Sequence, residues 1–397
     1  MSDGAGLAVA PPPASVLPRL ATPDWRLILG CFIGSRLWLT LVGLVTLMVM
    51  PPQPAPNLGV ASYAATLTDL YVRWDALWYV SIAEHGYSTI VPPFQGAGTI
   101  SYAFYPLYPL AMWALGSVTG LSAAAAGLVI SNASFLGALA VIYVLAEHWS
   151  GSRAVAGLAV ALLCVVPQSF VFSAVYTESL FVLLTALSVL LFERRRYALA
   201  GVAAALGSAS RSNGIFIVVY FGLAILRDRG LLGALRFWRE PEAYMPIVLA
   251  PLGLFAFWWF CMLTTGDAFA QKSTMVHGWQ WAFDWPWNNI VNQYRGTDFR
   301  FKYFMTLSLM MFAASLTLLR RRSWPLFGYC LACFILFWTG NLANSLLRYS
   351  LVLFPIFYGL ALVLAPHVIV RRLVLAVFGL CGTLLMVLWA IGSIFVT

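Results

Sequence analysis

Long apolar stretches alternate with short polar gaps along most of the chain. A helix needs about 17–25 apolar residues to cross a bilayer. Stretches of about that length occupy 27–50, 123–147, 153–173, 244–264, 302–319, 347–365 and 372–395, and two slightly shorter ones lie at 176–192 and 324–340. The pattern therefore predicts an all-α polytopic membrane protein.

The polar gaps orient the predicted helices, because basic residues favour the cytoplasmic side of a membrane. We assign to that side the gaps that contain Arg153, Arg194, Arg195, Arg196, Arg227, Arg229, Arg236, Arg239, Arg320, Arg321, Arg322, Arg371 and Arg372. Arg19 and Arg26 place the N-terminus there as well. The opposite, extracytoplasmic side then receives two long loops, at about 51–122 and 265–301.

Two segments do not fit a single crossing. Residues 198–226 have basic gaps on both flanks, so they must cross an even number of times; we expect two helices of about 14 residues with an apex at Arg211–Gly214. Residues 105–120 would invert every later loop if they crossed, so we expect a juxtamembrane or re-entrant helix. This topology gives about eleven membrane spans and places the C-terminus on the external side.

Composition supports a membrane protein and excludes other classes. The chain is 61% hydrophobic and 9% charged, with a mean hydropathy of +0.86, which is incompatible with a soluble domain. The net charge is +9, but the basic residues do not cluster on a helix, so nucleic acid is not an expected partner. All six cysteines lie in apolar stretches, where Cys330 and Cys333 behave as small hydrophobes. We expect a disordered cytoplasmic tail at 1–25 and one transmembrane domain at 26–397.

Ionisable residues concentrate just after the first apolar stretch, in the sequence YVRWDALWYVSIAEHGY. Asp75 either caps a helix and forms an ion pair with Arg73, or it takes part in a catalysed reaction. Asp69 starts the same acidic patch. His85 is either a ligand or base, or a hydrogen-bonded aromatic at the interface.

Two arginines stand alone at the predicted outer ends of helices. Arg211 lies in SRSNG, and Arg348 precedes Tyr349 near the last apolar stretches. A charge near the membrane interior costs about 2.5–3.5 kcal/mol, so each needs a carboxylate or an anionic ligand. Two such arginines on one side suggest a phosphate ligand.

The motif YTESLF contains Thr177 and Glu178. These residues either cap the next helix or contribute polarity to a site.

The second external loop begins with Gly266–Asp267 and is rich in tryptophan. Its tryptophans are Trp279, Trp281, Trp285 and Trp287. They are typical of an aromatic belt at the membrane interface, and the alternative is a surface that stacks on a sugar ring.

Six motifs in order resemble one family. RWDALWYVSIAEHGY, AFYPLYPL, YTESLF, SRSNG, TTGDAFA and RYSLVLFP, between about residues 36 and 357, resemble the PIG-V-like mannosyltransferases, which are related to the second mannosyltransferase of GPI-anchor assembly. The resemblance implies the GT-C architecture: many spans, a catalytic aspartate in the first external loop, and a lipid-phosphate-sugar donor.

Residue roles follow from the resemblance. It implies that Asp75 is the general base of a displacement that inverts the anomeric carbon. Arg211 and Arg348 would bind the donor phosphate. Expected lining residues of the site are Asp69, Arg73, Trp74, His85, Tyr176, Glu178, Asn213, Asp267 and Tyr349.

The expected partners are a polyprenyl-phosphate-linked sugar, a lipid or glycan acceptor, and membrane lipids. Short loops and only two lysines favour a bacterial member in the plasma membrane, where no GPI precursor exists, so the acceptor is open. A lipid-carrier flippase or transporter, an accessory subunit, and a transferase of another lipid-linked sugar are the alternatives. A divalent metal is possible, although no ligand constellation stands out.

Overall fold

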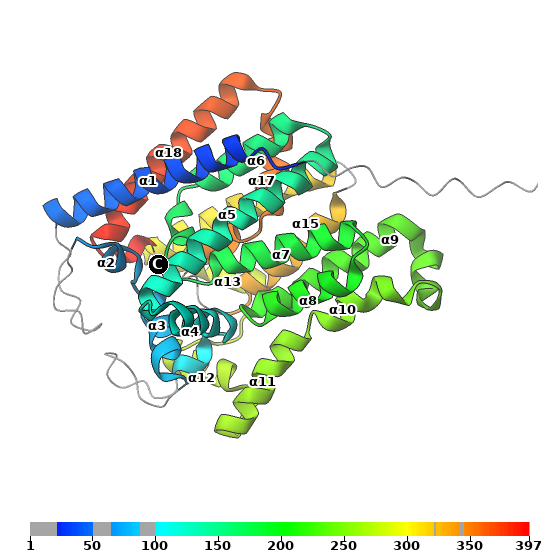
Figure 1. Ribbon diagram of the computed structural model, residues 1–397, viewed down its shortest axis with the longest axis horizontal. Helices are drawn as coiled ribbons and strands as arrows, with labels where there is room; N and C mark the ends of the chain where they lie inside the picture. Colours follow the sequence, from blue (N-terminus) through cyan, green and yellow to red (C-terminus); the bar gives the residue numbers. More distant parts are fainter. Residues whose placement is uncertain are drawn as a thin grey trace, which may run out of the picture.

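The computed structural model describes residues 22–50, 65–87, 100–320, 323–341, 343 and 345–396, and within them the chain forms helices and no β-strand. The α-helices are α1 Trp25–Val49, α2 Leu67–Tyr71, α3 Asp75–His85, α4 Leu107–Thr119, α5 Ala123–Ser150, α6 Arg153–Val165, α7 Glu178–Glu193, α8 Tyr197–Ser208, α9 Ile217–Leu235, α10 Met245–Leu249, α11 Leu252–Thr265, α12 Ala270–Trp279, α13 Pro286–Arg295, α14 Phe299–Ser315, α15 Trp324–Trp338, α16 Leu346–Leu351, α17 Pro355–Leu364 and α18 Val368–Ala390 (Figure 1). The predicted all-α class is confirmed. Most of the predicted tail at 1–25 lies outside the described residues.

Several helices have the length and composition of membrane spans. Five helical segments qualify on both counts: Trp25–Val49, Ala123–Ser150, Pro241–Thr265, Phe299–Leu319 and Val368–Ala390. Four shorter apolar helices are α6, α8, α15 and α17. The chain is therefore a multi-pass membrane protein. The total of about eleven spans stays a prediction.

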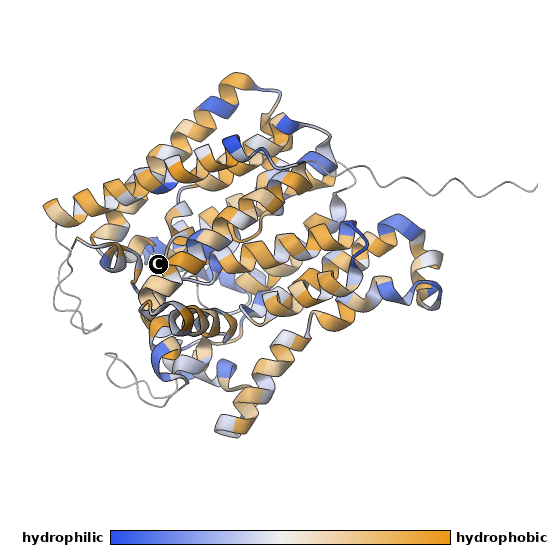
Figure 2. Cartoon of the chain, in the orientation of Figure 1, coloured by the Kyte–Doolittle hydropathy of each residue, from blue (hydrophilic) through white to orange (hydrophobic). Residues whose placement is uncertain are grey.

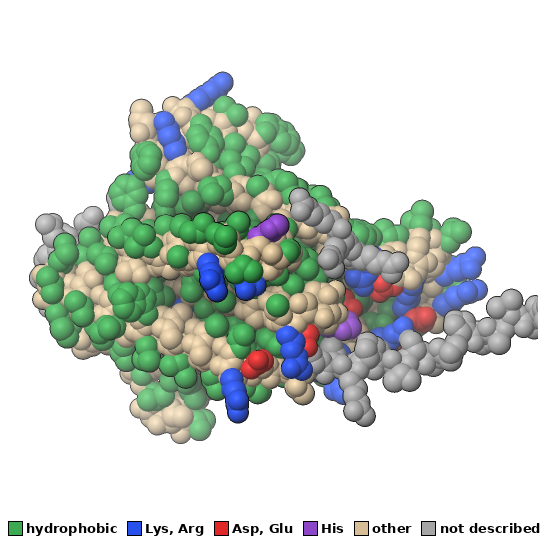
Figure 3. All heavy atoms as spheres, turned by 90° about the horizontal axis from the view of Figure 1, so that it is seen from above, with side chains coloured by type: hydrophobic (Ala, Val, Ile, Leu, Met, Phe, Trp, Pro, Cys, Tyr) green, Lys and Arg blue, Asp and Glu red, His purple; other side chains and the backbone are tan. Residues whose placement is uncertain are grey.

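Polar residues collect at one end of the bundle. Figure 2 shows hydrophilic ribbon where α7 turns into α8 and at the far end of α9. In the perpendicular view of Figure 3, several basic side chains lie at that same end and others lie elsewhere on the face, which is otherwise largely hydrophobic. The arginines at 194–196 and 227–239 belong to the α7–α8 link and to the end of α9 and the residues that follow it. The prediction that these gaps share one side of the membrane requires that they lie at one end of the bundle.

The segment 198–226 has the predicted form of two helices around an apex. α8 ends at Ser208, a short 3-10 helix covers Ser212–Phe216, and α9 begins at Ile217. A Cβ on Gly214 would lie 2.5 Å from the carbonyl oxygen of Gly207, so only glycine lets the apex pack this tightly on α8. The predicted short helix in 105–120 is α4, which has 13 residues.

Two apolar stretches that we expected to be continuous are broken. In 153–173, α6 ends at Val165 ahead of Pro167, and residues Ser169–Phe172 form a separate 3-10 turn. In 347–365, α16 ends at Leu351 and α17 starts at Pro355. A proline cannot donate to the carbonyl four residues earlier and clashes with it, which explains the second break. The expectation of unbroken helices was wrong at both places.

The break after α6 is stabilised by a buried arginine of α1. Arg36 donates from Nη2 to the carbonyl of Cys164 at 3.0 Å and from Nη1 to the carbonyl of Ser169 at 2.6 Å. The Cys164 carbonyl lies in the last turn of α6, where a carbonyl has no partner four residues further along the chain. Arg36 thereby joins α1 to the turn that leads into α7, whose first residue is Glu178.

Candidate active site

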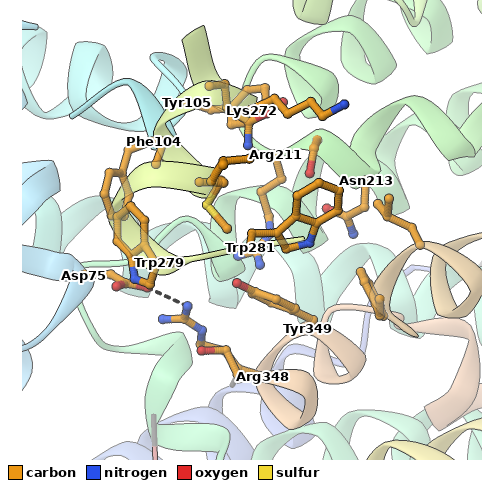
Figure 4. Close-up of a pocket in the computed structure, with 18 of the residues that line it drawn as sticks. Asp75, Phe104, Tyr105, Arg211, Asn213, Lys272, Trp279, Trp281, Arg348 and Tyr349 are labelled. Carbon is orange, nitrogen blue, oxygen red and sulfur yellow. Dashed lines mark hydrogen bonds and ion pairs between the residues drawn. The ribbon is translucent and has the colours of Figure 1, made fainter. Parts of the chain in front are cut away.

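A cavity of about 1170 Å³ lies at the end of the bundle opposite the arginine-rich loops, beside α3, α12 and the start of α16. Its walls come from segments that are far apart in sequence. Of the predicted site residues, those that line it are Trp74, Asp75, Tyr176, Glu178, Arg211, Asn213, Asp267, Arg348 and Tyr349 (Figure 4). The fold therefore brings both predicted arginines and the predicted base to one cavity.

Asp75 is the first residue of α3 and projects into the cavity from the helix N-terminus. The residue before it, Trp74, has φ 55° and ψ −119°, a conformation that is costly for a residue with a side chain. Such strain persists only where the surroundings enforce it. Arg73 supplies part of that enforcement, since it donates to the carbonyls of Asp69 at 2.8 Å and Trp389 at 3.1 Å.

Two carboxylates and two guanidiniums form one network in the cavity. Arg348 Nη2 donates to Asp75 Oδ2 at 2.6 Å. Glu178 Oε1 lies 3.2 Å from Arg348 Nε and 2.8 Å from Arg211 Nη1, so this carboxylate joins the two arginines. The Glu178 side chain is 2% exposed, whereas that of Asp75 is 31% exposed. Glu178 is thus the buried centre of the network, and Asp75 is its accessible end.

Tyrosine rings complete the packing around the guanidiniums. Arg211 and Arg348 lie 5.1 Å and 5.5 Å from the ring centroid of Tyr349. Arg348 lies 4.8 Å from the ring of Tyr176, whose hydroxyl donates to the carbonyl of Arg73 at 3.0 Å. These cation–π contacts restrict where each guanidinium points. The protein's own side chains therefore hold both arginines in position.

The two arginines are presented by irregular backbone. Arg211 precedes the 3-10 turn at the apex, and its Nη1 also donates to Thr177 at 3.0 Å. Arg348 lies in the six-residue helix α16, which starts after Ser345 in the left-handed conformation with φ 63°. Both segments are short and irregular at their ends, and each presents its arginine to the cavity.

Three predicted lining residues do not line the cavity. The Asp69 carboxylate accepts from Thr66 Oγ1 at 2.8 Å, as part of the cap of α2. Arg73 is buried against backbone carbonyls behind Trp74. His85 is exposed in the last turn of α3, ten residues beyond Asp75. Asp69 lies in α2, Arg73 lies between α2 and α3, and His85 lies almost three turns along α3 from Asp75, so closeness in sequence did not bring these side chains to the cavity.

The structure adds lining residues that were not predicted as site residues, among them Lys272, Trp279, Trp281 and Arg300. The sequence feature that these residues share is their position in the second predicted external loop, at about 265–301. Arg300 is paired with Asp298, with Nη2 and Oδ2 at 2.5 Å. Hydrogen bonds from Arg300 hold the pKa of the Asp298 carboxyl below its ordinary value. Of the four tryptophans in this loop, Trp279 and Trp281 line the cavity, whereas Trp285 and Trp287 do not and stack on each other.

No cluster of three or more histidine, cysteine, aspartate or glutamate side chains suited to a metal ion occurs in the part of the chain that the structure describes. The network of Asp75, Glu178, Arg211 and Arg348 pairs its carboxylates with guanidiniums instead. Chemically, it offers an accessible carboxylate next to two oriented cations.

Comparison with known proteins identifies related sequences. A family model described as mannosyltransferase (PIG-V) matches residues 40–263, more than half of the chain. GPI alpha-1,6-mannosyltransferase 2 of Rattus norvegicus is 31% identical over 177 residues, which are 42% of this chain and 34% of the rat protein. GPI mannosyltransferase 2 of Schizosaccharomyces pombe is 28% identical over 181 residues, 45% of this chain and 37% of that one. The matches thus span about a third of these relatives.

Solved structures give a more distant likeness. ArnT from Cupriavidus metallidurans bound to undecaprenyl phosphate aligns with a TM-score of 0.49 and 15% identity, over 83% of this chain and 59% of ArnT. The oligosaccharyltransferase of Archaeoglobus fulgidus, in complex with Zn and sulfate, aligns with a TM-score of 0.45 and 12% identity, over 90% of this chain and 53% of that one.

Proposed function

The chain belongs to the mannosyltransferase (PIG-V) family, of the GT-C class, and on that premise we propose that it moves mannose from a polyprenyl-phosphate-mannose donor to a lipid or glycan acceptor with inversion at the anomeric carbon. One observation carries the proposal. Asp75, Glu178 and Arg211 lie within the matched segment, and Arg348 from outside it completes their ionic network in a single cavity.

Asp75 is the base in this proposal. Arg348 occupies Oδ2 at 2.6 Å, so Oδ1 accepts the proton of the acceptor hydroxyl. The acceptor oxygen forms its bond to the anomeric carbon as the bond from that carbon to the phosphate oxygen breaks, and the electron pair stays on the phosphate. One displacement from the opposite face inverts the configuration, so a β-linked donor yields an α-linked product.

The arginines stabilise the leaving phosphate, which gains negative charge as the glycosidic bond breaks. Glu178 and Thr177 fix Arg211 through Nη1, and Asp75 and Glu178 fix Arg348 through Nη2 and Nε. The remaining N–H groups of both guanidiniums are then available to phosphate oxygens. Because the network is already assembled, little reorganisation is needed during the reaction. A transporter has no need for an accessible base beside this pair, which favours transfer over the flippase alternative.

A transfer assay tests the function. Purified protein in liposomes is given labelled polyprenyl-phosphate mannose and an extract of membrane lipids, and the product is treated with α- or β-mannosidase. We expect a labelled lipid or glycan that α-mannosidase alone cleaves. Parallel reactions with polyprenyl-phosphate glucose or arabinose test the other lipid-linked sugars. A β-linked product, or faster transfer from GDP-mannose, would contradict the proposed mechanism.

We also propose that the cavity opens on the extracytoplasmic face of a bacterial plasma membrane, opposite the arginine-rich loops. Ser212 is exposed and lines the cavity at the apex after Arg211. Ser212→Cys should therefore react with a membrane-impermeant maleimide in intact cells. Arg196→Cys, in the exposed link between α7 and α8, should react only after the cells are permeabilised. The reverse pattern would place the cavity on the cytoplasmic side.

A further inference from the structure

One wall of the cavity is formed by α12 and the turn that follows it. In the view of Figure 4, Trp281 lies between Lys272 and Tyr349, and Trp279 lies next to Asp75. Trp279 and Trp281 line the cavity, whereas Trp285 and Trp287 are 52% and 60% exposed and stack on each other. The tryptophans of this loop therefore form two pairs in different environments, and only the pair of Trp279 and Trp281 faces the cavity.

The position of Trp281 is built into the backbone. Gln280, between the two tryptophans, adopts the left-handed conformation with φ 56° and ψ 34°. The Asn341 side chain fixes this turn, donating to the carbonyl of Gln280 at 3.0 Å and accepting from the N–H of Ala282 at 2.8 Å. A Cβ on Gly340 would lie 2.3 Å from Trp281 Nε1. The indole therefore rests on a surface that only glycine provides.

Lys272 brings a positive charge to this wall. Its Nζ lies 6.0 Å from the ring centroid of Trp281. Lys272 forms no ion pair with any residue that the structure describes. By contrast, each arginine that lines the cavity, Arg211, Arg300 and Arg348, is paired with a carboxylate.

The nearest acidic residue along the chain does not neutralise that charge. Asp267 uses its oxygens to accept from the N–H of Phe269 at 2.8 Å and from the hydroxyl of Ser273 at 2.6 Å. The charge of Lys272 is thus available to a ligand in the cavity.

We propose that Lys272, Trp279 and Trp281 form the acceptor subsite, which binds a sugar ring that carries a neighbouring anionic group. The proposal rests on the proposed function, because the donor phosphate is assigned to the arginines and this wall is what remains for the acceptor. A planar indole packs on the apolar C–H face of a pyranose. The ammonium group forms a charge-assisted hydrogen bond with the anionic group and so selects acidic acceptors over neutral ones.

A labelling experiment tests the subsite without turnover. The chain has only two lysines, so an amine-selective reagent with mass-spectrometric detection follows Lys272 and uses Lys302, which does not line the cavity, as the internal control. The probe is mannose 6-phosphate. A ligand at twice its Kd should slow the labelling of Lys272 about threefold and leave Lys302 unchanged. Methyl α-mannoside and inorganic phosphate, each lacking one of the two features, should protect less.

Other outcomes would overturn the proposal. Equal protection of both lysines would indicate a non-specific effect, and no protection of Lys272 by mannose 6-phosphate would remove the subsite. Stronger protection of Lys272 by undecaprenyl phosphate would assign it to the donor instead. Since labelling needs no transfer, it distinguishes a wrong subsite from a wrong catalytic function.

Variants separate the roles of charge and ring in the transfer assay. Lys272→Gln should raise the apparent KM for the acceptor extract about 10- to 100-fold, with the KM for the donor unchanged and with recovery in Lys272→Arg. Trp281→Phe should be milder than Trp281→Ala. Lys302→Gln and Trp287→Ala are the matched controls outside the cavity and should behave as the original protein. An unchanged acceptor KM in Lys272→Gln would contradict the assignment.

Discussion

Replacement of Asp75 by asparagine is expected to lower the kcat of mannose transfer about 10²- to 10⁴-fold, which is the usual contribution of a positioned general base. The amide has nearly the same size as the carboxylate but cannot accept a proton. Because the Asp75 side chain is 31% exposed and Arg348 keeps its contact with Glu178, the fold should survive the change. Initial rates with labelled polyprenyl-phosphate mannose measure the effect.

The control for this variant is Asp228→Asn, the same substitution at a residue that is 54% exposed and paired with the neighbouring Arg227 at 2.7 Å. Its rate should stay within about twofold of the original, since exposed ion pairs contribute little. Asp75→Asn should still bind undecaprenyl phosphate, because the arginines remain. Turnover near the original rate in Asp75→Asn would show that another group takes the proton.

Replacement of Glu178 by glutamine should have the second large effect, on stability and on donor binding together. Glu178 is 2% exposed and contacts both Arg211 and Arg348, so loss of its charge leaves Arg211, which is 13% exposed, without its carboxylate partner. Breaking a buried ion pair from one side typically costs about 3–5 kcal/mol. We expect a clear fall in the apparent Tm in detergent and weaker protection of the protein against heat by undecaprenyl phosphate.

Two further variants show whether this effect comes from the buried network. Glu240→Gln removes a carboxylate that is 54% exposed and paired with Arg229, and it should change stability by less than about 1 kcal/mol. The double variant Glu178→Gln with Arg211→Gln removes both buried charges, so it should regain much of the lost Tm without regaining donor binding. If Glu178→Gln melts and binds donor like the original protein, Glu178 does not organise the arginines.

Helix boundaries could be predicted wherever local chemistry decides them. The apolar stretch 27–50 corresponds to α1, and 123–147 to α5, because an uninterrupted apolar helix is the stable form of backbone in lipid. The apex at Arg211–Gly214 was predictable from the basic gaps on both flanks of 198–226 and from the polar residues that interrupt this segment. The breaks after Val165 and Leu351 were missed because hydropathy alone does not register the backbone effect of Pro167 and Pro355.

The candidates for the base and for phosphate binding could be predicted because each carries a charge in an apolar setting. Asp75, Arg211 and Arg348 each stood out for that reason, and each lines the cavity. His85 and Asp69 stood out in the same way, and neither does. Lys272 and Trp281 were overlooked as site residues, since a lysine and a tryptophan in an external loop are ordinary at a membrane interface.

The order of residues alone determined that the chain is helical, crosses a membrane several times, places the arginines of 194–196 and 227–239 at one end and belongs to a mannosyltransferase family. These properties depend on local composition and on motif order. Only the tertiary structure decided which charges meet. Asp75 and Arg348 are 273 positions apart, and their contact at 2.6 Å depends on how helices pack, which no local pattern encodes. Glu178 became the link between the two arginines for the same reason.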